Sequence, residues 1–255
     1  MIPSKLIERL QQAQHLVILT SVGVSAESGI PTFRDALTGL WEKFDAEQLA
    51  CDDGFRADPA LVWGWYEWRR RCVLKAQPNP AHLTIAKLAE QIPKLTLITQ
   101  NVDDLHERAG NRDVLHLHGS LHKPRCIRCG TPYQLPEIDT AIADHDSSID
   151  PPTCSKCGGF IRPGVVWFGE SLPMHEWEQS VNATEDCDLL FIVGTSGLVW
   201  PAANLPYMAD KVGVPIVQIN PTTTSFNAIA HFNLCGKAGE ILPKLYAATF
   251  SEDVN

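Results

Sequence analysis

Short apolar runs recur along the chain and alternate with segments of helical periodicity. The first such segment, Ser4–Ala13, places Leu6, Ile7 and Leu10 on one helix face and leads into the apolar run Leu16–Leu19. We interpret the two as a helix that precedes a buried strand. Similar runs, rich in β-branched residues and bounded by polar or turn residues, predict strands at Leu95–Thr99, Leu189–Val193 and Pro215–Ile219.

The segments between these runs carry the helical pattern. Strands that are apolar throughout are buried on both faces, and their alternation with helices is typical of a parallel sheet covered on both sides. The fold class predicted by the pattern is therefore α/β. The helices are predicted at Ala81–Gln91, Pro173–Val181, Pro201–Lys211 and Thr223–His231.

Two stretches interrupt this alternation. Residues 35–77 are rich in Trp, Phe and Arg and have a helical pattern, whereas residues 122–163 hold paired cysteines and several prolines but no long periodic segment. We interpret both stretches as modules inserted into the α/β framework. The framework itself is then formed by residues 1–34, 78–121 and 164–255.

Composition limits the size and the partners of the protein. A chain of 255 residues, 44% of them hydrophobic, can bury one sizeable core and carry a small satellite domain. The formal net charge is −9, from 21 basic and 30 acidic residues, which removes the electrostatic basis for tight binding to a phosphate backbone. We therefore expect no nucleic-acid partner, and we expect a monomer.

The sequence also predicts a cytoplasmic location. No apolar run approaches the roughly 18 residues of a membrane span, so no membrane association is expected. The N-terminal segment has polar residues every few positions and does not read as a secretory signal. Scattered single cysteines beside CxxC pairs suit a reducing compartment better than a disulfide framework. These single cysteines are Cys51, Cys72, Cys187 and Cys235.

The paired cysteines form two CxxC knuckles, Cys126/Cys129 and Cys154/Cys157, and each knuckle is followed by glycine. Two residues between the sulfurs let one tight turn present both thiolates to a tetrahedral ion. The following glycine allows the left-handed backbone that such a turn needs. The alternative, two unrelated redox or buried pairs, does not explain the repeated spacing. We predict one zinc ion in a structural role, because four thiolates leave no open coordination position.

The loop after the first predicted strand is a candidate phosphate site. It reads TSVGVSAESGIPTFRD from Thr20 to Asp35, at the carboxyl end of a strand where dinucleotide phosphates usually bind. The GxGxxG motif is absent, since only Gly23 and Gly29 are present, so an ordinary nicotinamide dehydrogenase loses its strongest support. By itself the loop is a weak signal.

An ordered set of motifs is more specific than this loop alone. GVSAESGIPTFRD is followed by QNVD at residues 100–103, HGS at 118–120, the two knuckles, VVWFGE at 165–170, GTS at 194–196 and INP at 219–221. In this order, and from Leu6 to Leu245, the motifs resemble those of the sirtuin family. The resemblance implies a Rossmann-type large domain and a small domain formed by the zinc-ribbon and helical insertions. The chain departs from the family at Ser21-Val22-Gly23, where Gly-Ala-Gly is usual.

The function implied by the resemblance is NAD-dependent removal of acyl groups from protein lysines. The acyl group would pass to the ADP-ribose of NAD, the co-substrate, with release of nicotinamide and O-acyl-ADP-ribose. By the same resemblance His118 and Asn101 are catalytic, and an imidazole suits a general base because its pKa lies near physiological pH. His116 lies two positions away on a short predicted strand, and the following Gly119-Ser120 indicates that His118 is the one that faces the cleft.

Other readings of these polar residues are open from the sequence alone. An isolated histidine is commonly a satisfied core residue, and Asn101 with Asp103 fits an Asx-rich turn that caps a helix. The resemblance instead implies that both line a nicotinamide pocket. The NAD contacts that it implies are Gly23, Ser25, Ala26, Ile30, Phe33, Arg34, Gln100, Asn101, Asp103, Gly194, Thr195, Ser196, Asn220 and Ala238.

A further set of residues bears on the substrate. Ala46, Tyr66 and Arg69 stand at the spacing that marks the sirtuin subgroup acting on acidic acyl groups such as succinyl and malonyl. Tyr66 and Arg69 are three apart and neighbours on one helix face, where together they can bind a carboxylate. The alternative is a solvated arginine run beside packed aromatics. Val165 and Phe168 are implied as substrate contacts, with the peptide added as an extended strand between residues 165–170 and 197–200.

Two competing functions remain open at this stage. Mono-ADP-ribosyl transfer or plain NAD hydrolysis would use the same cofactor residues with another acceptor. A catalytically weakened, zinc-containing binding module is the alternative from a different class, and the unusual Ser21-Val22 pair favours it.

Overall fold

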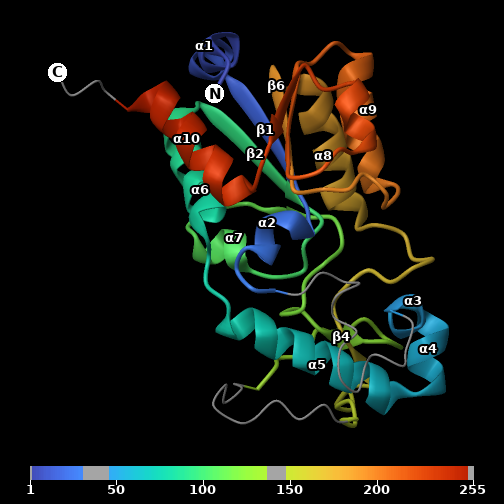
Figure 1. Ribbon diagram of the computed structural model, residues 1–255. Coiled ribbons are helices and arrows are strands. Elements are labelled where there is room, and N and C mark those ends of the chain that lie inside the picture. The colour runs from blue at the N-terminus through green and yellow to red at the C-terminus, as the bar shows by residue number, and fades with distance from the viewer. Residues whose placement is uncertain (1, 31–45, 137–147, 252–255) are drawn as a thin grey trace.

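The centre of the protein is a parallel sheet of six strands (Figure 1). The computed structural model describes residues 2–30, 46–136 and 148–251, with the side chains of residues 46 and 47 left out of the description. The strands lie in the order β3-β2-β1-β6-β7-β8, and all neighbours run parallel. They are β1 His15–Thr20, β2 Lys94–Thr99, β3 Leu115–His116, β6 Leu189–Val193, β7 Ile216–Asn220 and β8 Phe232–Cys235.

Helices cover both faces of this sheet (Figure 1). One face packs against α1 Ser4–Gln12, α6 Pro80–Gln91 and α10 Ala238–Phe250. The other face packs against α8 Met174–Asp186 and α9 Leu205–Lys211. Two short helices, α2 Val22–Ala26 and α7 Leu105–Arg108, follow β1 and β2. The α/β class predicted from the sequence is confirmed. No helix in the described ranges is long and apolar enough to cross a membrane.

Strand β1 shows why the apolar runs are continuous. All six of its residues are buried, and successive side chains point to opposite faces of the sheet. Leu16 and Ile18 pack with α1, α6 and α10, whereas Val17 and Leu19 pack under α8 and α9. Because each face is covered by helices, the middle of the strand, Leu16–Leu19, is apolar at every position.

A separate hydrophobic cluster forms the part of the molecule away from the sheet, drawn in the lower half of Figure 1. It contains Phe55, Trp65, Ile161 and Trp167. The first turn of α5 is closed by Asp58, whose side chain accepts from the Leu61 backbone N–H at 2.9 Å. The elements are α3 Ala46–Leu49, α4 Asp52–Ala57, α5 Pro59–Lys75 and the antiparallel pair β4 Arg125–Cys126 and β5 Ile161–Arg162.

The predicted helix Thr223–His231 is wrong in extent. Only one turn of 3-10 helix, η3 Ser225–Ala228, forms there. Thr224 accepts from the Phe226 backbone N–H at 3.1 Å, and Asn227 accepts from the Thr224 backbone N–H at 2.7 Å. These side chains satisfy the local backbone and compete with a longer helix.

The predicted helix Pro201–Lys211 is divided in two. It begins as the 3-10 turn η2 Ala202–Asn204 and continues as α9. The break lies next to Pro206, which has no backbone N–H to donate into a preceding turn.

Candidate active site

The cleft begins where the order of the strands in the sheet reverses. Strands β2 and β3 extend the sheet on one side of β1, and β6, β7 and β8 extend it on the other, so the switch point lies between β1 and β6. Two glycines bring the loops after these strands together: the Gly23 N–H donates to the Gly194 carbonyl at 2.9 Å. A Cβ on Gly23 would lie 2.5 Å from that oxygen, so the contact requires glycine.

A cavity opens beside this contact and extends toward α5. Gln100, Asn101 and Asp103 line it from the loop after β2, together with His118 and Ile30. The structure thus brings the predicted catalytic and nicotinamide residues together. The predicted substrate residues on this side of the molecule line the same cavity: Tyr66, Arg69, Val165 and Phe168.

A second cavity adjoins the first at Val22, which lines both. Its wall contains most of the remaining predicted NAD contacts, from the loops after β1, β6 and β7 and from the start of α10. The Asn220 amide donates to the Thr222 carbonyl at 2.8 Å, which closes the turn after β7. The predicted contacts in this wall are Gly23, Ala26, Gly194, Ser196, Asn220 and Ala238.

Ser25 and Thr195, also predicted to contact NAD, line neither cavity. Both are buried and hold residues that do line the first cavity. The Ser25 hydroxyl accepts from the Asn101 amide at 2.9 Å, and the Thr195 hydroxyl accepts from the Gln100 amide at 3.3 Å. Their place in the structure is behind the cavity wall.

The His118 imidazole is oriented by one backbone contact. Its Nδ1 lies 3.0 Å from the Gln100 carbonyl oxygen. A carbonyl only accepts, so Nδ1 carries the proton and Nε2 of the neutral ring keeps a lone pair. Burial lowers the pKa of His118, although the Gln100 bond opposes the shift. The ring is therefore neutral near physiological pH and can accept a proton at Nε2.

His116 has a different environment from His118. Strand β3 ends at His116, so the two histidines do not share the strand predicted for them, and the turn that follows allows them to point differently. His116 is absent from the cavity lining. Its Nδ1 lies 3.0 Å from the Asn101 carbonyl and its Nε2 lies 2.6 Å from the Glu107 carboxylate. Although burial lowers the pKa of His116, Glu107 outweighs it and the net pKa is raised.

Asn101 and Asp103 follow the end of β2 at Thr99 and lie in the loop before α7. Asp103 accepts from the Leu105 backbone N–H at 3.1 Å, which is the Asx turn considered as an alternative. The same residue lines the cavity, so the turn and the cavity coexist. Burial raises the pKa of the Asp103 carboxyl.

Tyr66 and Arg69 lie one turn apart on α5. Trp167 donates its indole N–H to the Tyr66 hydroxyl at 3.1 Å. Burial raises the pKa of Tyr66 to about 12, so the phenol keeps its proton. The Arg69 guanidinium lies over the Trp65 ring, 5.0 Å from its centroid. This end of the cavity therefore presents a phenol and a cation.

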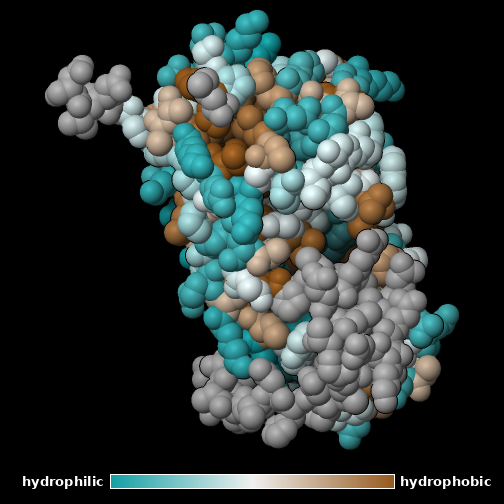
Figure 2. All heavy atoms as spheres, viewed as in Figure 1, coloured by the Kyte–Doolittle hydropathy of each residue, from teal (hydrophilic) through white to brown (hydrophobic). Residues whose placement is uncertain are grey.

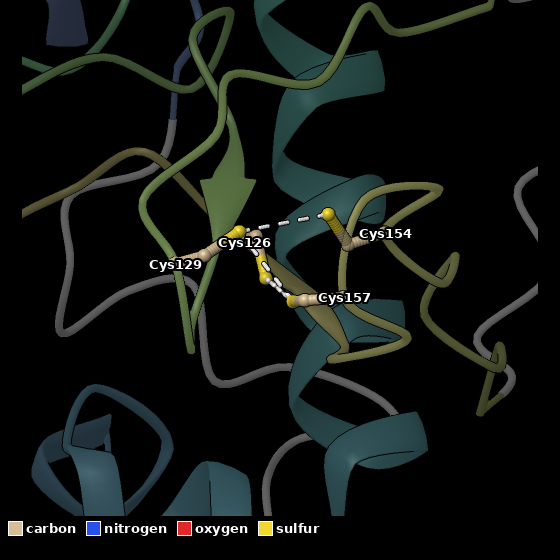
Figure 3. Close-up of side chains that lie close together, drawn as sticks. All are labelled: Cys126, Cys129, Cys154 and Cys157. Carbon is tan, nitrogen blue, oxygen red and sulfur yellow. Dashed lines mark hydrogen bonds between the residues drawn. The ribbon is translucent and has the colours of Figure 1, made fainter.

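Four cysteines lie close together at the hydrophobic cluster away from the sheet (Figure 3). The Cys126 and Cys157 sulfurs lie 3.4 Å apart, and those of Cys129 and Cys154 lie 3.7 Å apart. Metal–sulfur bonds of about 2.3 Å in a tetrahedral site put sulfurs roughly 3.8 Å apart, so the four thiols fit one ion. Gly130 and Gly158 have φ angles of 69° and 70°, as the knuckles require.

Some predicted residues lie outside the described part of the chain. These are Phe33, Arg34 and the side chain of Ala46. Conversely, sequence reasoning did not single out two residues. Trp167 lies within a quoted motif, but its contact with Tyr66 joins residues far apart in the sequence. His82 lies 3.4 Å from the Ser25 hydroxyl. His82 closes a capping box with Asn79 at the start of α6, a local signal that is readable from the sequence.

Fold and site together define an α/β protein with a dinucleotide-type cleft and a four-cysteine module beside it. Residues 21–201 match the Sir2 family. The chain is 57% identical to an NAD-dependent protein deacylase of Methylococcus capsulatus over 244 residues, which cover 96% of each chain. The protein belongs to the Sir2, or sirtuin, family.

Solved structures agree with this assignment. A Sir2 homologue in complex with NAD superposes with a TM-score of 0.88 at 44% identity, over 98% of this chain and 94% of that one. A Sir2 protein bound to an acetylated peptide gives a TM-score of 0.83 at 29% identity, over 96% of this chain and 98% of that one.

Proposed function

We propose that the protein is an NAD-dependent deacylase that removes succinyl, malonyl and also acetyl groups from protein lysines. The observation that carries this proposal is that the Nε2 lone pair of His118 shares a cavity with Asn101 and Asp103, and that this cavity meets a second one at Val22. The deacylase activity named for the relative from Methylococcus and the NAD complex of the solved homologue support it.

In this proposal one molecule of NAD occupies both cavities, with one end in each. The nicotinamide end would lie near Ile30, Asn101 and Asp103, and the adenosine end near Asn220 and Ala238. NAD, when bound, supplies a ribose carbon with nicotinamide as its leaving group and accepts the acyl group to give O-acyl-ADP-ribose. The contribution of the protein is orientation, because an amide oxygen is a weak nucleophile that has to be held against the reacting carbon.

His118 would take a proton from a ribose hydroxyl at Nε2. Because Nδ1 donates to the Gln100 carbonyl, Nε2 is the nitrogen left for the substrate. The Asn101 amide, held by Ser25, would orient the polar end of nicotinamide. Thr195 would act through Gln100, whose amide it holds at the cavity wall.

We further propose that the cavity end at Tyr66 and Arg69 selects acidic acyl groups. A guanidinium next to a phenol can bind a terminal carboxylate by charge-assisted hydrogen bonds, which are stronger than neutral ones. Tyr66 contributes as a donor because its raised pKa, about 12, keeps the phenol protonated.

We expect Arg69→Met to lower the ratio of kcat/KM for succinyl-lysine over acetyl-lysine peptides by about 10–100-fold, the range for one lost hydrogen bond to a charged group. Arg71→Met is the matched control, since Arg71 is on the same helix but does not line the cavity. Equal losses for the two peptides in the Arg69 variant would contradict a carboxylate-binding role.

The metal proposed for the four cysteines is zinc in a structural role. The set of four thiols offers no position for a substrate or a water, so no step of the reaction is assigned to the ion.

The acylated protein is proposed to bind as an extended strand along residues 165–170 and 197–200. Figure 2 shows apolar side chains in the upper half and near the middle of one face of the molecule. Phe168 is 50% exposed, and Leu198 and Trp200 are more than 60% exposed, which leaves an apolar rim for a peptide. The acetylated peptide in the solved Sir2 complex supports this mode.

We also propose a monomer in the cytoplasm, where the free thiols would stay reduced.

The decisive experiment incubates the protein with succinyl- and acetyl-lysine peptides, with and without NAD, and reads the products by mass spectrometry. NAD-dependent formation of O-acyl-ADP-ribose with nicotinamide is the expected result. ADP-ribose attached to protein would instead indicate ADP-ribosyl transfer, and free ADP-ribose with intact peptide would indicate NAD hydrolysis. If no nicotinamide is released, the protein is a binding module.

A further inference from the structure

The hydroxyl of Tyr66 has its direction set by a second aromatic residue. Trp167 and Tyr66 are only 2% and 3% exposed, and the indole Nε1 lies 3.1 Å from the phenol oxygen. An indole N–H can only donate, so the phenol oxygen is the acceptor in this bond. The phenol proton therefore has to point along another direction.

Within the described ranges, the Tyr66 hydroxyl donates to no protein oxygen. Tyr66 lines the first cavity together with Arg69, which lies one turn further along α5. A buried donor without a partner is unfavourable, so a group entering the cavity gains by accepting this proton. The phenol, whose oxygen already accepts from Trp167, offers its proton to the cavity, and a guanidinium only donates, so this end of the cavity is selective for acceptors.

The indole itself is held from several sides. The Trp167 backbone N–H donates to Glu170 at 2.8 Å, and the Arg162 guanidinium lies over the indole with its Cζ 3.4 Å from the ring centroid. Arg162 and Glu170 form an ion pair, and the Phe55 ring lies 5.4 Å from the indole. A donor fixed in this way leaves the phenol little freedom to turn.

We propose that Trp167 is a specificity-determining positioning residue: its N–H occupies the acceptor side of the Tyr66 hydroxyl and aims the phenol proton into the cavity, toward the carboxylate of an acidic acyl group. This role rests on the acyl selectivity proposed above. Without the indole N–H, the Tyr66 hydroxyl can rotate and can either donate to or accept from a neutral acyl group. The preference for a carboxylate then falls although Tyr66 and Arg69 are both present.

The test compares kcat/KM for succinyl-lysine and acetyl-lysine peptides in the wild type and in Trp167→Phe, Tyr66→Phe and the double variant. The ratio of the two values is the readout, because any loss common to both substrates cancels. We expect Trp167→Phe to lower the succinyl-to-acetyl ratio by about 3–10-fold, the range for one neutral hydrogen bond, and Tyr66→Phe to lower it at least as much. The double variant should match Tyr66→Phe alone, because the indole acts only through the phenol.

Trp63→Phe is the matched control, since Trp63 is a buried tryptophan of α5 that does not line the cavity. It should keep the wild-type ratio even if its melting temperature falls. Trp167→Leu, which also lacks the N–H, replaces Trp167→Phe if that variant does not fold.

Two failures are distinguishable. A wild type with no preference for succinyl-lysine overturns the proposed acyl selectivity and this role with it. The other failure concerns Trp167 alone. If Tyr66→Phe lowers the ratio as expected but Trp167→Phe leaves it unchanged, the role of Trp167 is overturned and the acyl selectivity stands. Additive losses in the double variant also overturn the role of Trp167, because the indole would then act independently of the phenol.

Discussion

The state of His118 fixes which of its nitrogens can take part in proton transfer. Nδ1 donates to the Gln100 carbonyl, and burial lowers the pKa of the ring. A base has to be unprotonated to work, so a lowered pKa extends activity toward acid pH. The Gln100 carbonyl thus fixes the orientation of the ring, and burial keeps the ring neutral for its proposed role as a base.

We expect the acidic limb of kcat/KM against pH to have an apparent pKa below 6.5, the ordinary histidine value from which His118 is lowered. As pH falls through this value, His118 gains a proton and activity is lost. The measurement is the pH profile with an acetyl-lysine peptide at low substrate concentration. A limb centred above pH 7 would count against His118 as the base.

At Ser21 and Val22 the chain carries larger side chains than the family usually has. Both residues line the first cavity and are partly exposed. Ser21 has φ −141°, extended backbone that any residue adopts, so the serine introduces no backbone strain. The consequence of the two side chains is therefore steric.

Replacing Ser21 with glycine and Val22 with alanine is expected to tighten NAD binding, because four heavy atoms leave a loop that lies against the proposed co-substrate site. Calorimetric titration of NAD into the wild type and the double variant measures the change. Unchanged or weaker binding would show that the loop accommodates its present residues.

At the scale of elements, the four-cysteine module is connected to the end of the first cavity at Tyr66 and Arg69. The antiparallel pair β4 and β5 carries Cys126 on one strand and Arg162 on the other. Arg162 in turn pairs with Glu170 and lies over Trp167. Loosening of the knuckles should therefore reach the first cavity through Arg162.

Chelation of the proposed zinc, or Cys129→Ala, is expected to loosen this module and to abolish activity indirectly. Limited proteolysis with mass spectrometry would show new cleavage around residues 126–162, and metal analysis would show loss of one ion. Cys235→Ala is the matched control, because Cys235 is an exposed thiol outside the cluster. An active and fully folded metal-free protein would refute the structural role.

The hydrophobic pattern predicts the central strands because their burial is continuous. Strands β1 and β6 are buried at every position and were predicted from their runs. Strand β8 has one buried residue among four, so it produces no run, and it was missed. The turn η3 was mistaken for a helix because its side-chain bonds to the backbone leave the periodicity unchanged. The boundaries predicted between domains remain predictions.

The site was predictable to the extent that it lies in local motifs. The loops at residues 100–103 and 194–196 follow strands, and the sequence places them at one edge of the sheet. The bond between Trp167 and Tyr66 joins residues 101 positions apart and depends on how the modules pack. No periodicity or spacing encodes that contact, so it required the structure.

At the scale of the whole molecule, buried histidines couple stability to pH. His82 is fully buried, and burial lowers its pKa from 6.5 to about 4. Between these two values the unfolded chain binds a proton that the folded chain does not. The free energy of unfolding therefore decreases as pH falls from 6.5 toward 4, by up to about 3 kcal/mol for this one group.

His82→Gln is expected to reduce this pH dependence, because the substituted side chain does not titrate. Urea denaturation of the wild type and the variant at several values between pH 7.5 and pH 4.5 gives the slope of the free energy of unfolding. His175→Gln, at an exposed position of α8, is the matched control. A variant with the same slope as the wild type would show that His82 is not responsible.

Val22 belongs to the walls of both cavities, and this shared position bears on inhibitor design. A compound small enough to stay on one side of Val22 meets a single set of side chains, either those around Asp103 or those around Asn220. Two such compounds can be optimised separately and then joined by a linker that passes over the valine. The joined molecule would gain affinity from both halves, and the width of the passage at Val22 would limit the linkers that fit.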